Sequence, residues 1–455
     1  MATKKAAHKT KKKAKASAAE AAAVAAPDMA ALKAQATQAI RDLRGVEREP
    51  SGVVLGPPSS KKMMALRALR QQINTDAKST IIGFAEETAA SFLLRRPSGI
   101  TELDAATGGG LPAGCPVEIS GPEGAGKTYL AMQYMLMHQQ LYGSEACMFY
   151  ACTEPTKGFD FQRAAKMGLK LGLPPTYIAE LEKAREINGL PPFTKEELTN
   201  MSEKVGELLI IQAATGEQVF TAVLACIESN EFGIGIVDSI TNVLPEANAE
   251  RDLEDNNKVG ARASLVTDFI SHYTPMTNKF GAPHRTTLIG IGQARAKQNR
   301  QSYEKEWDTP APWAWKHAVQ LRIQVQNGQK IKKQLRKIDY VIGKEVLWTI
   351  TKGKAGAHEH MKGSTEFFFD DVVPELGLCY GADRYDGLIL AGMSQGLIRE
   401  QQSKVYVTNA VGETIAHGIP GLPALKAMMQ VDFEFELEMR QVLMQKQGIT
   451  CLYRE

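Results

Sequence analysis

The sequence lacks the features that mark secreted, metal-stabilised and membrane proteins. Its six cysteines include no C-x-x-C pair, which argues against a zinc site or a disulfide framework and fits a reducing cytosol. The alanine-rich stretch after the first lysines is interrupted by Glu20, Pro27 and Asp28, so it is neither the core of a signal peptide nor a membrane span. An organellar transit peptide is an alternative, although lysine stands where such peptides use arginine. We expect a cytoplasmic protein.

Acidic residues are absent from the first 16 positions, which hold seven lysines. Removing these seven positive charges from the net charge of +3 leaves the rest of the chain at −4. A lysine block of this kind is usually unfolded and attracted to polyanions such as nucleic acid. A solubilising terminus is the alternative, because the block has no geometry that would make a contact specific.

The length of 455 residues predicts two or three domains, and an apolar fraction of 44% with a charged fraction of 23% is typical of globular proteins. The composition changes along the chain and divides it into four segments. We expect a disordered basic tail rich in alanine and lysine (1–60), a helix followed by a short strand (61–97), an α/β core (98–375) and a small C-terminal α/β domain (376–455).

Short apolar runs alternate with helical patterns from Gly99 onward. Five of them predict a parallel sheet with helices on both faces: PVEIS (116–120), ACMFYA (146–151), ELLIIQA (207–213), FGIGIVD (232–238) and TTLIGIG (286–292). Three more lie close enough together to extend the sheet antiparallel: VQLRIQV (319–325), EVLWTIT (345–351) and EFFFD (366–370). The charged segment 169–206, with two Pro-Pro pairs, predicts two short helices in a surface insertion without an assigned function.

The string GPEGAGKT matches the phosphate-binding motif G-x-x-x-x-G-K-[ST], with a strand before it and a helical run after it. Glycines let backbone N–H groups face phosphates, Lys127 supplies charge to the β and γ phosphates, and the Thr128 hydroxyl can bind Mg²⁺. A glycine-rich structural turn is the alternative. We expect ATP and Mg²⁺ to bind here, with contacts from Gly121, Pro122, Glu123, Gly124, Ala125, Gly126, Lys127, Thr128 and Tyr129.

Three polar residues stand at the ends of neighbouring strands, at the edge where open α/β sheets bind ligands. Asp238 ends FGIGIVD and is the expected acid of the magnesium site, with a simple Asp-Ser turn as the alternative. Glu154 follows ACMFYA and is the candidate base that orients water, with a solvated carboxylate as the alternative. Gln293 ends TTLIGIGQ and can sense the γ-phosphate or merely close the strand.

Two polar loops are candidate DNA contacts. Residues 294–313 mix basic and aromatic side chains, a pattern that suits tracking of a phosphate backbone and stacking of single-stranded bases. The candidates there are Arg295, Lys297, Arg300, Tyr303 and Trp307. Residues 245–264 add Arg262, although several acids in that loop weaken the case. An ordinary solvated loop is the alternative for both.

The motifs also follow one another in a recognisable order. That order is SGITELDAATGGGLPAGCPVEISGPEGAGKT (98–128), FYACTEP, TGEQ (215–218), IVDS, LIGIGQ, WKHAVQLRI (315–323), WTITKGKAG (348–356) and YDGLILAGMSQGLI (385–398). Over roughly residues 63–400 the chain resembles the RecA recombinase family, closest in pattern to bacterial RecA and phage UvsX. The resemblance implies a RecA-type P-loop ATPase, in a bacterial or phage-infected cell, that forms a homo-oligomeric filament on single-stranded DNA and exchanges it with a homologous duplex. Single-strand-binding and loading proteins would be further partners.

The resemblance also implies roles for individual residues. Glu154 matches the catalytic glutamate, Asp238 the Walker B acid and Gln293 the link from the γ-phosphate to the second DNA loop. Further matches are Lys352 and Lys354, which would reach the neighbouring subunit's ATP, Asp160 at the adenine, and Ile81, Ile82 and Phe84 at the interface between protomers.

The chain departs from the family pattern in two places. The second DNA loop ends in Pro310, Ala311 and Pro312 where the family has two glycines, and the insertion 169–206 follows the catalytic strand. A RecA-like paralogue or a ring helicase that binds ATP and DNA without strand exchange therefore stays an alternative.

Overall fold

The computed structural model describes residues 60–76, 94–153, 158–246, 260–277, 285–296, 307–308, 310–335, 338–354, 356–369 and 380–454. The chain divides into two units, residues 1–88 with 279–282 and the remainder. The described part of the first unit is helix α3 (Ser60–Asp76), which confirms the helix expected after residue 61. The basic tail and the expected docking strand with Ile81, Ile82 and Phe84 lie outside the described residues.

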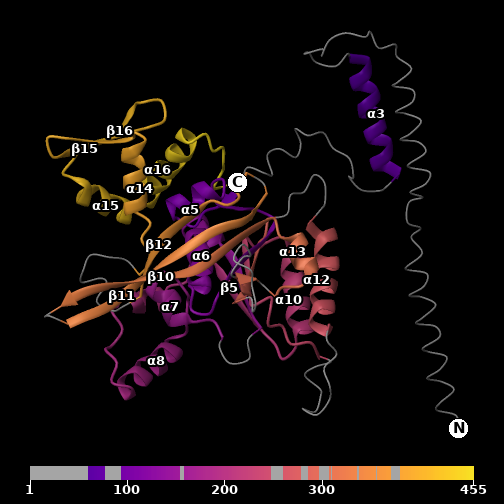
Figure 1. Cartoon of the computed structure of the whole chain (residues 1–455), viewed down its shortest axis with the longest axis horizontal. Coiled ribbons are helices and arrows are strands. Elements are labelled where there is room, and N and C mark those ends of the chain that lie inside the picture. The colour runs from indigo at the N-terminus through magenta and orange to yellow at the C-terminus, as the bar shows by residue number, and fades with distance from the viewer. Residues whose placement is uncertain are drawn as a thin grey trace. The chain divides into compact units, whose positions relative to one another are not determined.

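A nine-stranded sheet forms the centre of the second unit, in the order β13-β12-β11-β10-β3-β7-β6-β4-β5 (Figure 1). The strands are β3 (Pro116–Gly121), β4 (Cys147–Cys152), β5 (Glu207–Gln212), β6 (Ile234–Asp238), β7 (Thr287–Gln293), β10 (Leu321–Leu335), β11 (Ile338–Gly353), β12 (Lys362–Phe368) and β13 (Gly381–Ala382). Neighbours from β10 to β5 are parallel, and the pairs from β10 to β13 are antiparallel. This is the predicted mostly parallel sheet with an antiparallel extension.

One strand of the extension differs from the expectation. The run VQLRIQV becomes the start of β10, which pairs parallel to β3, so the antiparallel part begins only at β11. The reason is helix α13 (Trp313–Ala318), which lies in the chain between β7 and β10 and returns the chain to the starting edge of the sheet. Strands β10 and β11 then form a long hairpin, which Figure 1 shows as a ribbon that extends beyond the other strands.

Both faces of the sheet are covered, which explains the near-continuous apolar runs. Along β4, Met148 and Tyr150 belong to one buried cluster with helix α6 (Lys127–Tyr142), whereas Phe149 and Ala151 belong to another with helix α10 (Gly216–Ser229). The second cluster also takes in α12 (Ala261–Thr277) and α13. Within the described ranges, no helix combines the length and apolar character that crossing a bilayer requires.

The insertion 169–206 forms the two expected helices, α8 (Pro175–Ile187) and α9 (Lys195–Ser202). Helix α9 begins with a capping box, in which Thr194 and Glu197 exchange hydrogen bonds between side chain and backbone. Ile178, Phe193 and Met201 form a small core that also contacts α7 (Phe161–Lys166) through Ala165. The insertion is therefore packed against the core on its own apolar side chains.

Residues 380–454 contain the three-stranded antiparallel sheet β14-β15-β16 and three helices. Their bounds are α14 (Asp386–Ser394), β14 (Ile398–Gln401), β15 (Lys404–Thr408), β16 (Thr414–Ile419), α15 (Leu422–Val431) and α16 (Phe433–Lys446). These elements share an apolar cluster that includes Leu388, Val405, Leu425 and Leu443. The expected boundary near residue 376 falls outside the described residues.

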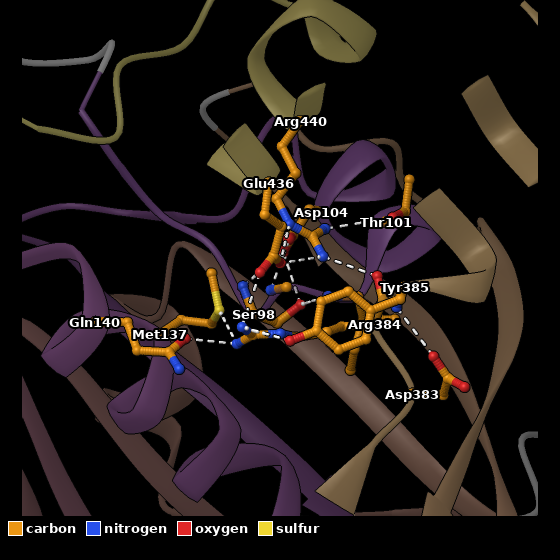
Figure 2. A network of polar contacts seen from close by, with 12 residues as sticks. Ser98, Thr101, Asp104, Met137, Gln140, Asp383, Arg384, Tyr385, Glu436 and Arg440 are labelled. Atoms are coloured by element: carbon orange, nitrogen blue, oxygen red, sulfur yellow. Dashed lines mark hydrogen bonds and ion pairs between the residues drawn. The ribbon is translucent and has the colours of Figure 1, made fainter. Parts of the chain in front are cut away.

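Buried charges join this C-terminal region to the core (Figure 2). The Glu436 carboxylate accepts from Arg384 at 2.8 Å and from Nε of Arg440 at 2.9 Å. Arg384 also donates to Gln140 of α6 at 2.6 Å, and Arg440 donates to Thr101 of α5 (Thr101–Ala106) at 3.3 Å. Each guanidinium thus has partners on both sides of the junction, so the two parts share one charge network.

Asp104 of α5 supplies a second carboxylate beneath this network. It accepts hydrogen bonds from the backbone N–H and hydroxyl of Ser98, at 2.8 and 2.7 Å, and from the backbone N–H of Gly99 at 2.9 Å. Complete burial raises the pKa of Asp104 to about 6, against the lowering effects of these donors and of Arg440. Holding the Asp104 carboxylate charged at neutral pH therefore lowers the stability of the folded state.

We predict that Glu436→Gln destabilises the protein by about 3–5 kcal/mol, because two buried guanidinium groups lose their carboxylate. Urea unfolding followed by circular dichroism measures this. Glu438→Gln, an exposed glutamate on the same helix, serves as the matched control and is expected to change little. Equal stability of the two variants would contradict the role assigned to Glu436.

We also predict a pH dependence from Asp104. Because its folded pKa of about 6 exceeds the ordinary value of 3.8, its contribution to stability is complete below about pH 4 and is lost as the pH rises through 6. The stability of the wild type relative to Asp104→Asn should therefore fall by roughly 2–3 kcal/mol between about pH 4 and pH 7. Unfolding of both proteins across that range measures it, and a difference that does not vary with pH would refute the assignment.

Candidate nucleotide-binding site

The phosphate-binding loop connects β3 to α6, as its motif requires. Gly124 and Gly126 have φ values of +68° and +94°, a conformation that side-chain-bearing residues rarely adopt. At Gly121 a Cβ atom would overlap the carbonyl oxygen of Val325 on β10. Helix α6 begins at Lys127, so its first N–H groups and its positive dipole end face the loop. These features make the loop a binding site for an anion.

Lys127 lies within the loop that it serves. Its ammonium donates to the carbonyl oxygen of Pro122 at 2.8 Å, and 9% of the residue is exposed. The side chain thus folds back over the loop, where it can contact phosphates bound to the backbone N–H groups.

The two expected magnesium ligands lie together. Asp238 Oδ2 accepts a hydrogen bond from the Thr128 hydroxyl at 3.0 Å and from the Tyr150 hydroxyl at 2.6 Å. Hydroxyl and carboxylate oxygens are the donors that Mg²⁺ prefers, so this pair fits the metal that accompanies a nucleotide. Tyr150 could not be predicted from the sequence, because only the register of β4 against β6, which pairs Cys152 with Asp238, brings it here.

Gln293 lies beside the loop. It pairs with Gly121 in the ladder between β7 and β3, and the backbone N–H of Ala294 donates to the Gly121 carbonyl at 2.9 Å. The backbone N–H of Gln293 also donates to the Thr241 hydroxyl at 3.2 Å. A change in the loop can therefore reach the segment that follows β7 directly.

Glu154 lies outside the described residues, but the residue before it is firmly held. The Thr153 backbone N–H donates to the Asp238 carbonyl at 2.9 Å, and the Thr153 hydroxyl bonds to the backbone of Ser239 at 2.7 and 2.8 Å. The peptide bond between Asp238 and Ser239 is cis. The chain thus leaves β4 next to the acid that ends β6.

A cavity of about 200 Å³ lies beside the start of α6. Its lining is aromatic and basic, and consists of Tyr129, Asp160, Gln162, Arg163, Lys166, Met167, Phe368, Phe369 and Tyr380. The Arg163 guanidinium lies 4.5 Å from the centre of the Tyr129 ring. Asp160 caps α7 by accepting from the Arg163 N–H at 3.0 Å and pairs with its guanidinium at 3.3 Å. Flat, polarisable walls of this kind suit a planar base.

Lys344 of β11 is a further residue that the sequence analysis missed. Its ammonium donates to the carbonyl of Gly124 in the phosphate-binding loop and to Asn327 Oδ1, the latter at 3.1 Å. Burial, followed by the charges of Lys127 and Arg163, lowers the pKa of Lys344. The signal was hidden because Lys344 lies more than 200 residues from the loop in sequence.

Lys352 and Lys354 do not join this group. Lys352 pairs with Arg322 in the ladder, and Arg322 pairs with Glu118 near the beginning of β3, whereas the loop follows the end of β3. Eight residues of strand separate Lys352 from Lys344, which is about 26 Å. Lys352 donates to the carbonyls of Lys316 and His317 at 2.9 and 3.2 Å. These lysines therefore lie toward the amino ends of the parallel strands, whereas their own phosphate-binding loop lies at the carboxyl ends.

The candidate DNA contacts are only partly described. Arg262 donates to the carbonyls of Val243 and Thr241, both at 3.1 Å, and so holds the chain that follows β6. Arg295 and Trp307 belong to two short paired strands, β8 (Arg295–Ala296) and β9 (Trp307–Asp308). Lys297, Arg300 and Tyr303 lie outside the described residues.

Comparison with known proteins finds matches to ATPase families over the residues that form this site. Residues 96–250 match the family model of the KaiC ATPase, and residues 194–371 match that of the RecA N-terminal domain. Protein RecA of Bacteroides thetaiotaomicron is 27% identical over 347 residues, which cover 76% of this chain and 87% of that protein. Protein RecA of Thermotoga neapolitana is 25% identical over 385 residues, which cover 84% of this chain and 93% of that protein.

Among solved structures, the crystal structure of the RadB recombinase is similar with a TM-score of 0.36 and 18% identity, covering 60% of this chain and 96% of that one. The two family models together span the phosphate-binding loop, Asp238, Gln293 and the β10–β11 hairpin, in the order that the fold requires. The chain is therefore similar to the RecA family across its ATPase core, from the phosphate-binding loop to the β10–β11 hairpin.

Proposed function

We propose that the chain is an ATP-dependent DNA recombinase that forms filaments on single-stranded DNA and catalyses homologous pairing and strand exchange. The observation that supports this most is the ladder register, which sets Lys352 level with Glu118 of β3 and away from the phosphate-binding loop at the end of that strand. The Lys352 ammonium contacts the carbonyls of Lys316 and His317 instead of the loop of its own copy, so we assign Lys352 and Lys354 to the nucleotide of a neighbouring copy. An assembly of successive copies then completes each site.

In this proposal ATP binds at the carboxyl ends of the parallel strands. Lys127 and the N–H groups of the loop would hold the phosphates, and Thr128 and Asp238 would hold a Mg²⁺ ion that neutralises phosphate charge. The base would enter the cavity beside Arg163 and Asp160. Tyr150 keeps the Asp238 carboxylate oriented through its hydrogen bond. Glu154, carried by the firmly held Thr153, orients the attacking water.

Filament assembly needs a docking edge, and β5 offers one. It is the last strand of the nine-stranded sheet, and Leu209 on it is 45% exposed. An unpaired strand edge is a template for another chain. We propose that the segment with Ile81, Ile82 and Phe84 from the adjacent copy adds to it.

DNA is proposed to bind through the segment after Gln293, which carries Arg295, Lys297, Arg300, Tyr303 and Trp307. The hydrogen bond from Ala294 to Gly121 connects the first residues of that segment to the phosphate-binding loop. Hydrolysis can then change the hold on DNA.

One observation favours the second candidate, a RecA-like paralogue that binds ATP and DNA without strand exchange. The end of the DNA segment is fixed where the family has glycines: Ala311 is buried in the apolar cluster of α12 and α13, and Pro312 caps α13. A rigid end limits how far the segment can rearrange.

We predict that a mixture of two inactive variants recovers ATPase activity. Glu154→Gln should bind ATP but lose turnover by roughly 10²–10⁴-fold, since the water is no longer oriented. Lys352→Ala should fail because the neighbouring site lacks its cation. In an equal mixture, roughly a quarter of the interfaces join an intact Glu154 to an intact Lys352, so that fraction of activity should return on single-stranded DNA.

The control for this mixture is Glu154→Gln with the exposed Lys332→Ala, in which activity should only reflect the share of intact Glu154. Phosphate release measures all of these. Absence of recovery in the first mixture would contradict the shared site.

We further predict ATP-dependent filaments on single-stranded DNA, visible by electron microscopy, and joint molecules with a homologous duplex. ATP hydrolysis measured in the same samples should rise when single-stranded DNA is added. Filaments without joint molecules would select the paralogue, and closed rings that unwind forked DNA would select a helicase. No ATP-dependent assembly on DNA would rule out the recombinase.

A further inference from the structure

Among the described residues, Lys127 and Lys344 donate to carbonyls of the phosphate-binding loop, and Arg163 lies close enough to Lys344 to lower its pKa. Arg163 is paired with Asp160, but Lys344 donates only to two neutral acceptors in the described part of the chain, the carbonyl of Gly124 and the amide oxygen of Asn327. Like charges placed together at a site raise its free energy until an anion arrives. Lys344 is thus a cation without a carboxylate at the mouth of an anion-binding loop.

The position of Lys344 is fixed by the sheet. Strand β11 passes so close to the loop that a Cβ atom on Gly126 would lie 3.1 Å from Cγ2 of Val346 and 3.8 Å from Cε of Lys344. The ladder pairs Lys344 with Lys330, next to a bulge that begins at Asn327. The aliphatic part of the Lys344 side chain therefore packs on the loop, and its ammonium reaches the backbone carbonyl of Gly124.

We propose that Lys344 is a second phosphate-binding lysine, supplied by the same copy of the chain, which exchanges the carbonyl of Gly124 for a phosphate oxygen of the bound nucleotide. This inference rests on the proposed binding of ATP and goes beyond it in assigning a cation from β11 to the nucleotide's own subunit. Lys127 and Lys344 then hold the phosphates from two sides, one from α6 and one from the hairpin.

A purely structural tether between β11 and the loop would give the same hydrogen bonds, so the test must separate charge from donation. Lys344→Gln keeps an amide that can donate to Gly124 but removes the charge. Lys344→Arg keeps the charge. Lys332→Gln removes an exposed lysine from the same hairpin and is the matched control.

The measurement is calorimetric binding of ATP, ADP and adenosine, with Mg²⁺, to each full-length variant, together with thermal unfolding of the ligand-free proteins. We expect Lys344→Gln to weaken ATP and ADP binding about tenfold and to leave adenosine binding unchanged, because a charge-assisted hydrogen bond to phosphate is lost. Lys344→Arg and Lys332→Gln should bind ATP as the wild type does. Ligand-free Lys344→Gln should unfold at an unchanged or higher temperature, since a repulsion has been removed.

Wild-type affinity for ATP in Lys344→Gln would overturn the inference and leave the proposed function intact. An equal loss for adenosine and ATP would also overturn it, because the variant would then have distorted the whole site. Failure of the wild type to bind ATP would instead remove the proposed function itself, together with this deduction.

Discussion

The pairing of β3 with two parallel neighbours is the constraint on which the site depends. On one side β7 sets Gln293 against Gly121, and on the other β10 sets Val325 against the same glycine. The phosphate-binding loop therefore leaves the sheet in a slot between two strands, with no room for a side chain at its first position. A shift of either neighbour by one residue would change the loop and its surroundings together.

The strand order also separates the negative and positive groups of the site. The oxygen atoms that could bind a metal ion lie next to β6 and β4, where Asp238 accepts hydrogen bonds from Thr128 and Tyr150. The extra cations come from the other elements, Lys344 from β11 and Arg163 from α7. A metal ion and a polyphosphate have opposite charges, so the two halves of the site suit the two halves of a metal–nucleotide complex.

Patterns within short stretches of sequence were enough to predict much of the fold and part of the nucleotide-binding site. The P-loop motif, the acid at the end of β6 and the runs buried on both faces can each be recognised in a few consecutive residues, and so can the two short helices of the insertion. Tyr150 and Lys344 were not predicted, because their roles depend on register between strands far apart in the sequence. Asp104, Glu436 and Arg440 are charged residues that sequence patterns assign to the surface, yet all three are buried where the C-terminal region meets the core.

One continuous strand, β11, carries both the lysine that touches its own phosphate-binding loop and the lysine at the far edge of the sheet. If the second serves a neighbour, then each nucleotide is met by two copies of the same strand, one by its beginning and one by its end. In the proposed filament, the spacing of successive nucleotides would then be tied to the distance along β11 between the two lysines and to the reach of their side chains. The reach of two side chains on one rigid strand would thus couple the shape of that filament to the occupation of its nucleotide sites.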